Sequence, residues 1–252
     1  MENKQLFLLG GHDLEMLTIS KVLNEKGLLV KDNTLQWDTA CLSKYQTEIE
    51  QYGNTPLWTI YGIELKEDII VPSNYIRIDH HNDYSHKPSS LEQIMFILHL
   101  PLNRFQQLVA ANDSAYIPGL QKAGATSFEI ENIRYEDRKA QGVTIEDERL
   151  AEEAIRNKEI HEDLIIVRAT SSRFSPICER LFPYKKLLIY TEQELMYYGE
   201  DINELVTLCQ AHIKEKRVFY GGGANGYLGT VKNAFTKEEL KYITQQIRYY
   251  KK

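Results

Sequence analysis

The eight residues from Ile76 to Asp83 read Ile-Arg-Ile-Asp-His-His-Asn-Asp, and they indicate the fold of the chain. The apolar side chains that lead up to Ile78 alternate with a charged one, a pattern typical of a short buried strand. The strand then leads into a run of carboxylate and imidazole side chains, Asp79-His80-His81. Ligands of α/β sheets bind just beyond the carboxyl ends of the strands, and carboxylate with imidazole suits Mn²⁺, Fe²⁺ or Zn²⁺. The alternative is a loop in which Asp79 caps a turn and both histidines are solvated.

Three further potential ligands follow the first predicted strand, which is the apolar run 5–9. His12, Asp13 and Glu15 lie at the turn from this strand into a helix predicted over 13–26. Another role is open to two of them. An aspartate is a good N-cap, and a glutamate in the first turn interacts favourably with the helix dipole.

Two more carboxylates extend the pattern. The apolar and aromatic run 56–63 predicts a strand that leads directly into Glu64. Asp113 follows a helix predicted to end at Ala111, where it either completes that helix or supplies a last ligand. Three acidic strand ends within the first 83 residues favour a metal site at one edge of a parallel sheet. The other elements predicted in this half are a strand at 28–30 and helices over 40–51 and 89–100.

The C-terminal half predicts a second α/β unit. Residues 121–160 are charged and helix-forming, which predicts a helical connector interrupted near Gly142. A buried strand at 164–167 ends in a turn rich in cations and hydroxyls, and a strand at 217–220 leads into five glycines between Gly221 and Gly229. The other predicted elements are helices over 176–181, 203–215 and 236–250 and a strand at 187–190.

The glycine segment leaves the backbone able to approach a ligand and to direct N–H groups at an anion. It fits neither the Walker pattern nor a dinucleotide fingerprint, and a flexible hairpin is the alternative. With the basic turn beside it, a phosphate or carboxylate pocket is favoured, because arginine binds such oxyanions through two bonds. The residues that we expect at this pocket are Arg168, Ser172, Arg173, Gly221, Gly222, Gly223 and Asn225.

Composition sets limits on partners and location. The chain has 252 residues and a net charge of −6, so no general affinity for long nucleic acid follows from its charge. Acidic residues are in excess before residue 160 and basic residues after it, which either separates a metal-binding half from a phosphate-binding half or is ordinary surface variation. The three cysteines are widely spaced and no apolar run suits a signal peptide or membrane span, so we expect a cytoplasmic protein without a membrane partner.

Taken together, these residues resemble the DHH phosphoesterase superfamily. That superfamily includes RecJ-type exonucleases, oligoribonuclease/phosphatases, cyclic-dinucleotide phosphodiesterases and family II inorganic pyrophosphatases. The resemblance follows the whole chain in order, through Glu64, Asp79-His80-His81 and the triple glycine 221–223, and Asp-His-His is its closest match.

This sequence departs from the family at three motifs. A histidine several residues before two aspartates is usual in the first motif, whereas here His12 directly precedes Asp13 and the second acid is Glu15. The second-motif aspartate is Glu64. The histidine after the triple glycine is replaced by Ala224-Asn225.

The resemblance implies a DHH-like catalytic domain with a parallel sheet over 1–120, the connector over 121–160, and a smaller substrate-binding α/β domain over 161–252. It implies a metal-dependent phosphoesterase with two divalent ions, expected to be Mn²⁺. Its implied metal ligands are His12, Asp13, Glu15, Glu64, Asp79, His80 and Asp113. His81 would assist at the attacked phosphate, together with Asp79.

The expected substrates are small nucleotides, cyclic nucleotides or short oligonucleotides rather than long nucleic acid. Two alternatives stay open. The chain is either a nucleotide-binding protein with altered catalysis on the same scaffold, or a hydrolase of a non-nucleotide phosphoester. A homodimer is a further possibility.

Overall fold

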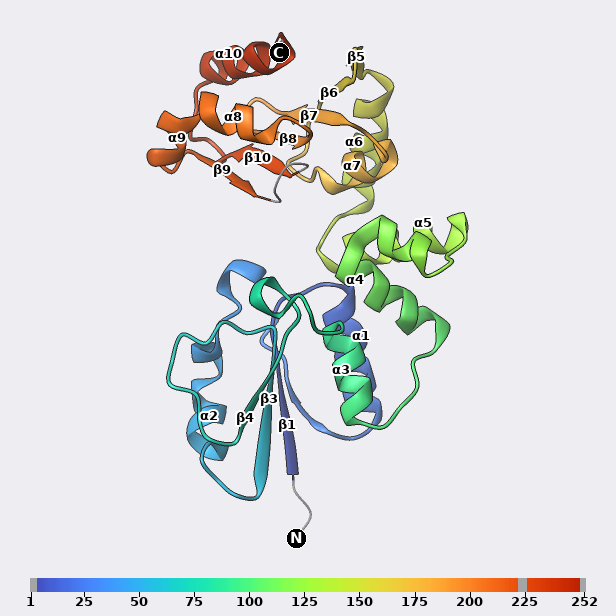
Figure 1. Ribbon diagram of the computed structural model, residues 1–252, viewed down its shortest axis with the longest axis vertical. Coiled ribbons are helices and arrows are strands. Elements are labelled where there is room, and N and C mark those ends of the chain that lie inside the picture. The colour runs from blue at the N-terminus through green and yellow to red at the C-terminus, as the bar shows by residue number, and fades with distance from the viewer. Residues whose placement is uncertain (1–3, 222–225, 250–252) are drawn as a thin grey trace. The chain divides into compact units, whose positions relative to one another are not determined.

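Two α/β units make up the chain, one over Met1–Gly142 and the other over Val143–Lys252 (Figure 1). The computed structural model describes residues 4–221 and 226–249. Each unit has its own sheet and its own apolar core, as the sequence predicted. The boundary at Gly142 falls inside the stretch predicted as a connector. Helix α5 (Ser127–Ala140) belongs to the first unit, and α6 (Ile145–Arg156) to the second.

A four-stranded parallel sheet forms the centre of the first unit. Its strands lie in the order β2 (Leu29–Lys31), β1 (Lys4–Leu9), β3 (Trp58–Ile63) and β4 (Tyr75–Ile78). Side chains of β1 alternate between two cores, with Phe7 and Leu9 in one and Leu6 and Leu8 in the other. The uninterrupted apolar run of β1 follows from this burial on both faces.

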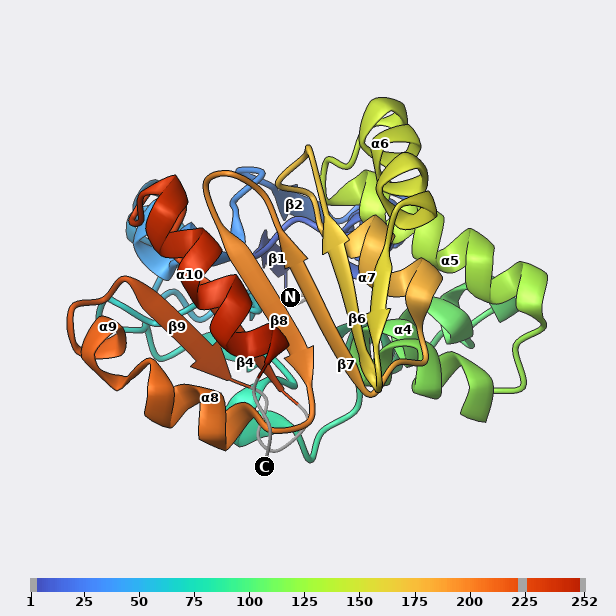
Figure 2. The same cartoon turned by 90° about the horizontal axis from the view of Figure 1, so that it is seen from above.

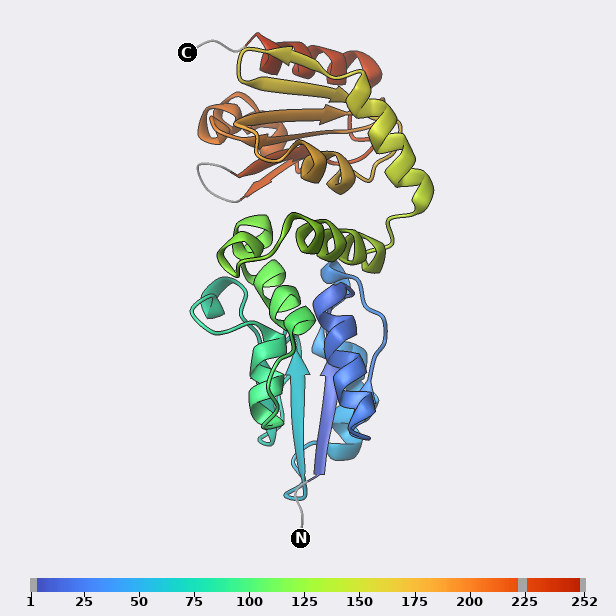
Figure 3. The ribbon, with the colours of Figure 1, turned by 90° about the vertical axis from the view of Figure 1, so that its right-hand side faces the viewer.

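Helices cover both faces of this sheet. Helices α1 (Leu14–Glu25) and α3 (Ser90–Ile97) share the core of Phe7 and Leu9, and α2 (Gln46–Tyr52) lies on the opposite face (Figures 1 and 3). Asp13 is the N-cap of α1, and Ser89 with Glu92 forms the predicted capping box of α3. The carboxyl ends of β1, β3 and β4 therefore open at one edge, beside the N-termini of α1 and α3.

The predicted end of a helix at Ala111 is wrong. Helix α4 (Arg104–Lys122) continues past Asp113 to a kink at Ala115 and Tyr116, where φ is −153° and 54°. The kink accommodates Pro118, which lies in the first turn of the helical segment that follows. Backbone N–H groups in a first turn have no acceptor within the helix, so a proline, which lacks this group, is tolerated there. Asp113 therefore lies in the last turn before the kink.

Two other predicted helices are broken in the structure. The stretch 40–51 begins as a 3₁₀ helix (Leu42–Tyr45) before α2, and 203–215 forms two short helices, α8 (Ile202–Leu208) and α9 (Gln210–Lys214). Three strands of the second unit were not predicted: β5 (Glu159–His161), β8 (Leu195–Gly199) and β10 (Tyr227–Thr230). The last of these lies within the glycine-rich segment.

The second unit is built on a six-stranded mixed sheet (Figure 2). Its order is β5, β6 (Leu164–Arg168), β7 (Lys186–Tyr190), β8, β10 and β9 (Val218–Gly221). Only the described pair β6 and β7 runs parallel. Helices α6 and α7 (Ser175–Leu181) pack on one face of the sheet, and α8 and α10 (Lys237–Arg248) on the other. Within the described residues, no helix is both long and apolar enough to cross a membrane.

Candidate metal centre

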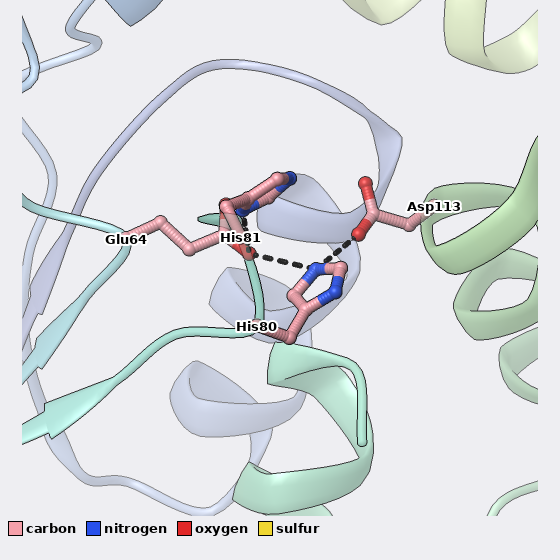
Figure 4. A group of neighbouring side chains, drawn as sticks. All are labelled: Glu64, His80, His81 and Asp113. Carbon is pink, nitrogen blue, oxygen red and sulfur yellow. Dashed lines mark ion pairs between the residues drawn. The ribbon is translucent and has the colours of Figure 1, made fainter. Parts of the chain in front are cut away.

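Side chains from three segments converge at the edge where the first sheet ends. Glu64 directly follows β3, His80 and His81 come just after β4, and Asp113 reaches in from α4. One ligand atom of each of these four residues lies within 4.8 Å of the others. Figure 4 shows Glu64 and Asp113 approaching the two imidazoles from opposite sides. The parallel sheet and helix α4 thus bring together residues up to 49 positions apart.

His80 is at the centre of this group. Its Nε2 lies 2.5 Å from Asp113 Oδ2, 3.3 Å from Glu64 Oε1 and 3.7 Å from Glu15 Oε2. The more exposed His81 lies at the margin, with its Nδ1 3.8 Å from Glu64 Oε1. Glu15, which enters from the first turn of α1, is thus a further carboxylate of the same group.

Four buried atoms of the centre lack a hydrogen-bond partner among the described residues: Glu15 Oε2, Glu64 Oε2, His80 Nε2 and Asp113 Oδ2. The short contact between His80 and Asp113 does not have hydrogen-bond geometry. Leaving a buried polar atom without a partner costs about 1–3 kcal/mol, and more for a charged group. A divalent cation held by the group of Glu64, His80, His81 and Asp113 would give buried atoms of this kind a partner, and carboxylate with imidazole is a donor set that such ions accept. The residues therefore fit a metal ion.

The opposite oxygens of the two glutamates are already fixed by α3. Glu15 Oε1 accepts from the backbone N–H of Leu91 at 3.0 Å, and Glu64 Oε1 accepts from the Ser90 hydroxyl at 2.7 Å. Each glutamate therefore has one oxygen held by α3 and one buried oxygen without a partner among the described residues. Partners of this kind orient metal ligands and increase the affinity of the site.

Two acidic side chains beside His80, those of Asp13 and Glu15, have raised pKa values. Burial raises the pKa of Asp13 to about 8, against the N–H bond from Met16, and the charges of Asp113 and Glu64 raise it further. Burial likewise raises the pKa of Glu15 well above its ordinary value. The neighbouring carboxylates, which add to the effect of burial, also favour a cation at the same place.

At His80, the neighbouring carboxylates together have a larger effect on the pKa than burial has. Burial alone would lower its pKa, but the carboxylates of Asp113, Glu15 and Glu64 outweigh burial and raise it to about 12. Without a metal, the imidazolium is thus the cation that the surrounding carboxylates stabilise.

A polar network on α5 lies behind the centre. Arg134 Nη1 donates to Asn112 Oδ1 at 2.7 Å and to Asp137 Oδ2 at 2.8 Å, and Asp137 Oδ1 accepts from the N–H of Leu14 at 3.3 Å. Asn112 precedes Asp113, and Leu14 follows Asp13. The network therefore ties together the two segments that carry these carboxylates. Nothing in the sequence distinguished these residues from the other charges of a predicted connector.

The other predicted ligands lie close by but are arranged differently. Asp13 is buried, and its Oδ1 accepts from the Met16 N–H at 2.8 Å, so its predicted N-cap role holds. Asp79 Oδ1 accepts from the His81 N–H at 2.9 Å and lies 3.5 Å from His81 Nδ1, so Asp79 also stabilises a turn. His12 is half-buried. Neither His12 nor Asp79 belongs to the group of four described above.

The predicted substrate residues of the second unit lie on its surface. Arg168 and Ser172 line one cavity of about 710 Å³, together with Glu192 and Lys237. Arg168 Nη2 is 3.4 Å from Glu192 Oε1, and the exposed Arg173 donates its backbone N–H to Ser171 Oγ at 3.1 Å. Gly221 ends β9, whereas Gly222, Gly223 and Asn225 lie outside the described residues.

A scan against models of protein families and a search of curated proteins both find no match. Among solved structures, the chain is similar to a pGpG-specific phosphodiesterase from Vibrio cholerae, at 10% identity and a TM-score of 0.48 over 98% of each chain. It is also similar to RecJ from Thermus thermophilus in complex with Mn²⁺, at 12% identity and a TM-score of 0.48. That likeness covers 98% of this chain and 52% of RecJ, so the chain spans about half of RecJ.

A third similar structure is the DHH domain of a member of the s1p family of ribosomal proteins. The identity is 10% and the TM-score 0.49, over 99% of this chain and 88% of that one. These likenesses concern the fold, and the chemistry proposed below rests on the side chains of this chain.

Proposed function

We propose that this protein is a metal-dependent phosphoesterase that hydrolyses small nucleotides, cyclic nucleotides or short oligonucleotides. The observation that carries the proposal is the set of carboxylates that surrounds His80 Nε2, in which Glu15, Glu64, His80 and Asp113 each have a buried atom without a partner among the described residues. The motif resemblance to DHH phosphoesterases supplies the reaction class.

Glu15, Glu64, His80 and Asp113 would hold a divalent ion, for which we propose Mn²⁺. A bound divalent ion polarises a phosphoryl group and lowers the pKa of a water molecule, and two such ions are common in phosphoester hydrolysis. His12, Asp13 and Asp79 border the four residues and remain our proposed ligands for a second ion.

His81 is placed to act on the substrate. Its side chain is 43% exposed, and its Nδ1 faces Asp79 Oδ1 at 3.5 Å. A carboxylate beside an imidazole fixes the orientation of the ring. His81 would therefore donate a proton to the leaving oxygen, as a positioned general acid does.

Measuring metal content and activity on the same preparations tests the proposal. Hydrolysis with added Mn²⁺ would be measured on mononucleotides, cyclic dinucleotides, di- to pentanucleotides and non-nucleotide phosphoesters. We expect EDTA to abolish hydrolysis and Mn²⁺ to restore it. Activity that survives EDTA contradicts the metal mechanism, and metal-bound protein that binds nucleotides without cleaving any of them indicates a binding protein.

Glu64→Gln sharpens this test because the amide oxygen still accepts from Ser90 while the charge is lost. We expect this variant to keep its fold and to lose bound metal and activity together. Glu25→Gln is the matched control, since Glu25 is an exposed carboxylate at the far end of α1.

Substrate length gives a second, independent measurement. A protein that acts along long nucleic acid gains most of its affinity from neutralising several phosphates, and this chain carries a net charge of −6. We expect the rate per end to fall as the oligonucleotide lengthens, and binding to long single strands to be weak at physiological salt. Faster cleavage of a 30-mer than of a dinucleotide would favour a processive exonuclease instead.

A further inference from the structure

A cavity of about 500 Å³ lies in the first unit beside Glu64 and His81. Its lining includes one large aromatic side chain, Trp37, and two cations, Lys66 and Arg77. The volume lies within the range of pockets that bind small molecules. None of the roles assigned above uses these three side chains.

The chain holds Trp37 firmly at this cavity. Trp37 begins a short 3₁₀ helix (Trp37–Thr39), and the residues after it pair with the chain beyond β3. In that pairing, Lys66 donates its N–H to the carbonyl of Ala40 and accepts from the N–H of Leu42, each at 2.9 Å. Trp37 is therefore anchored next to the segment that carries Glu64.

The indole ring lies directly over a glycine. A Cβ atom at Gly11 would come within 2.4 Å of the Trp37 ring, so only glycine allows this contact. The edge of the ring meets His81, with centroids 5.8 Å apart. Even so, 46% of the Trp37 surface stays exposed. One side of the ring is thus supported while much of it remains available to a ligand.

The two cations differ in their availability. Arg77 is engaged, since its Nε donates to Glu67 at 2.8 Å and its guanidinium lies over the ring of Tyr84. Lys66, in contrast, is exposed and forms no ion pair with any described residue. The Lys66 ammonium is therefore free to bind an anion in the cavity.

We infer that this cavity binds the base end of the substrate, with an aromatic base stacked on Trp37 and a neighbouring phosphate paired with Lys66. The inference rests on the proposed function and narrows it. The substrate is then a phosphoester that carries a planar aromatic ring, rather than a sugar phosphate or a polyphosphate. Stacking tolerates any base, because every base has a π face.

Calorimetric titration of the full chain in EDTA tests this inference without turnover. The probes are guanosine 5′-monophosphate, which carries a base, and ribose 5-phosphate, which does not. We expect the nucleotide to bind roughly 5- to 100-fold more tightly, the range that base stacking on an aromatic side chain contributes. Trp37→Ala should remove most of that ratio, and Trp37→Phe should keep most of it.

Two controls separate stacking from folding. Trp58 is the other tryptophan of the chain and packs against Tyr52 at a tilted angle, with ring centroids 4.4 Å apart, so Trp58→Phe should leave the ratio unchanged. Lys66→Met should weaken both probes by a similar factor, since both carry a phosphate.

Equal affinities of wild-type protein for the two probes overturn the inference, as does a Trp37→Ala variant that keeps the wild-type ratio. An equal loss for both probes in Trp37→Ala and Trp37→Phe also overturns it, because that result indicates a structural role. Failure of the proposed function is a separate outcome. In that case no Mn²⁺-dependent hydrolysis is detected, and the ratio of the affinities for the two probes can still be measured.

Discussion

The candidate metal centre of the first unit is largely buried, whereas the predicted substrate residues in the basic turn of the second unit are exposed. In the first unit, Glu15, Glu64 and His80 are buried, and each keeps an atom without a partner. In the second unit, Arg168 is largely exposed and already lies 3.4 Å from Glu192, and the Lys232 ammonium donates to Ser172 Oγ at 3.0 Å.

This difference indicates that the first unit is organised to bind a ligand that loses its hydration shell. Buried groups interact strongly because the local dielectric is low, and they are costly when left unsatisfied. Exposed pairs contribute little, since water and salt screen them. We therefore expect the first unit to dominate metal binding and catalysis, and the second unit to adjust substrate affinity.

The largest effect should come from Asp113→Asn. The amide has the shape of the carboxylate but lacks the charge that lies 2.5 Å from His80 Nε2. We expect metal affinity to fall by a factor of roughly 100 or more and activity to fall with it, as happens when a charged ligand is lost. Elemental analysis and calorimetric Mn²⁺ titration measure this. Metal content equal to that of the wild type would exclude Asp113 from the site.

The next effect concerns pH. Burial raises the pKa of Asp13 to about 8 in the folded protein, whereas an unfolded aspartate titrates near 3.8. Between these values the folded state binds more protons, so the free energy of unfolding of metal-free protein should fall as pH rises from about 4 to 8. The raised pKa of His80 acts in the same sense above 6.5, the ordinary pKa of a histidine.

Thermal unfolding of metal-free protein from pH 5 to pH 8 measures this slope. Asp13→Asn keeps an oxygen that can cap α1 through Met16, so it should lower the pH dependence without removing the cap. Added Mn²⁺ should restore stability at pH 8. A melting temperature that rises over this range would contradict the expected protonation.

A smaller effect should follow from Asp137→Asn, which weakens the network between α1, α4 and α5. The lost charge-assisted bonds from Arg134 should cost about 1.5–3 kcal/mol of stability. Loss of this support should lower metal affinity by roughly 10-fold. Glu148→Gln is the matched control in the second unit, where Glu148 pairs with Arg180 at 2.6 Å. It should reduce stability and leave metal affinity unchanged, and an equal drop in metal affinity would remove the distinction between the two units.

The smallest effects are expected on the surface of the second unit. Arg168→Ala and Arg173→Ala should raise KM by less than about 10-fold and leave metal content intact, because exposed charges are screened. Lys185→Ala is the control, since Lys185 is exposed and its ammonium pairs with Asp163 at 3.1 Å, away from this turn in the sequence. If both arginine variants keep the wild-type KM, the second unit does not contact the substrate through this turn.

The sequence predicted the parts of the centre that depend on local pattern. Strand alternation placed Glu64 and His80 at strand ends, and the parallel sheet then brought them together. The partners that fix the ligands could not be predicted, because they are contacts across long separations in the chain. Leu91 N–H lies 76 residues from Glu15, and Leu14 N–H lies 123 residues from Asp137.

Local rules also failed at α4. The polar run around Asp113 and the following proline indicated a helix end, but the chain continues through a kink at Ala115 and Tyr116. The Tyr116 ring packs against the Arg134 guanidinium at 4.3 Å. Pro118 indicates a break near this point, but the contact between Tyr116 and Arg134 joins residues far apart in the sequence, and no pattern of neighbouring residues indicates it.

At Glu64, the backbone conformation lowers stability, whereas the side chain is needed for the proposed metal binding. Glu64 adopts φ of 52°, in the left-handed region, which disfavours a non-glycine residue by about 1–2 kcal/mol. Glycine would relieve this strain and would also remove a buried carboxylate. Selection for heat resistance alone should therefore favour Glu64→Gly. The selected variants would have a higher melting temperature and would not bind a metal. If variants from a laboratory evolution experiment retain Glu64, the selection acted on activity as well as on stability.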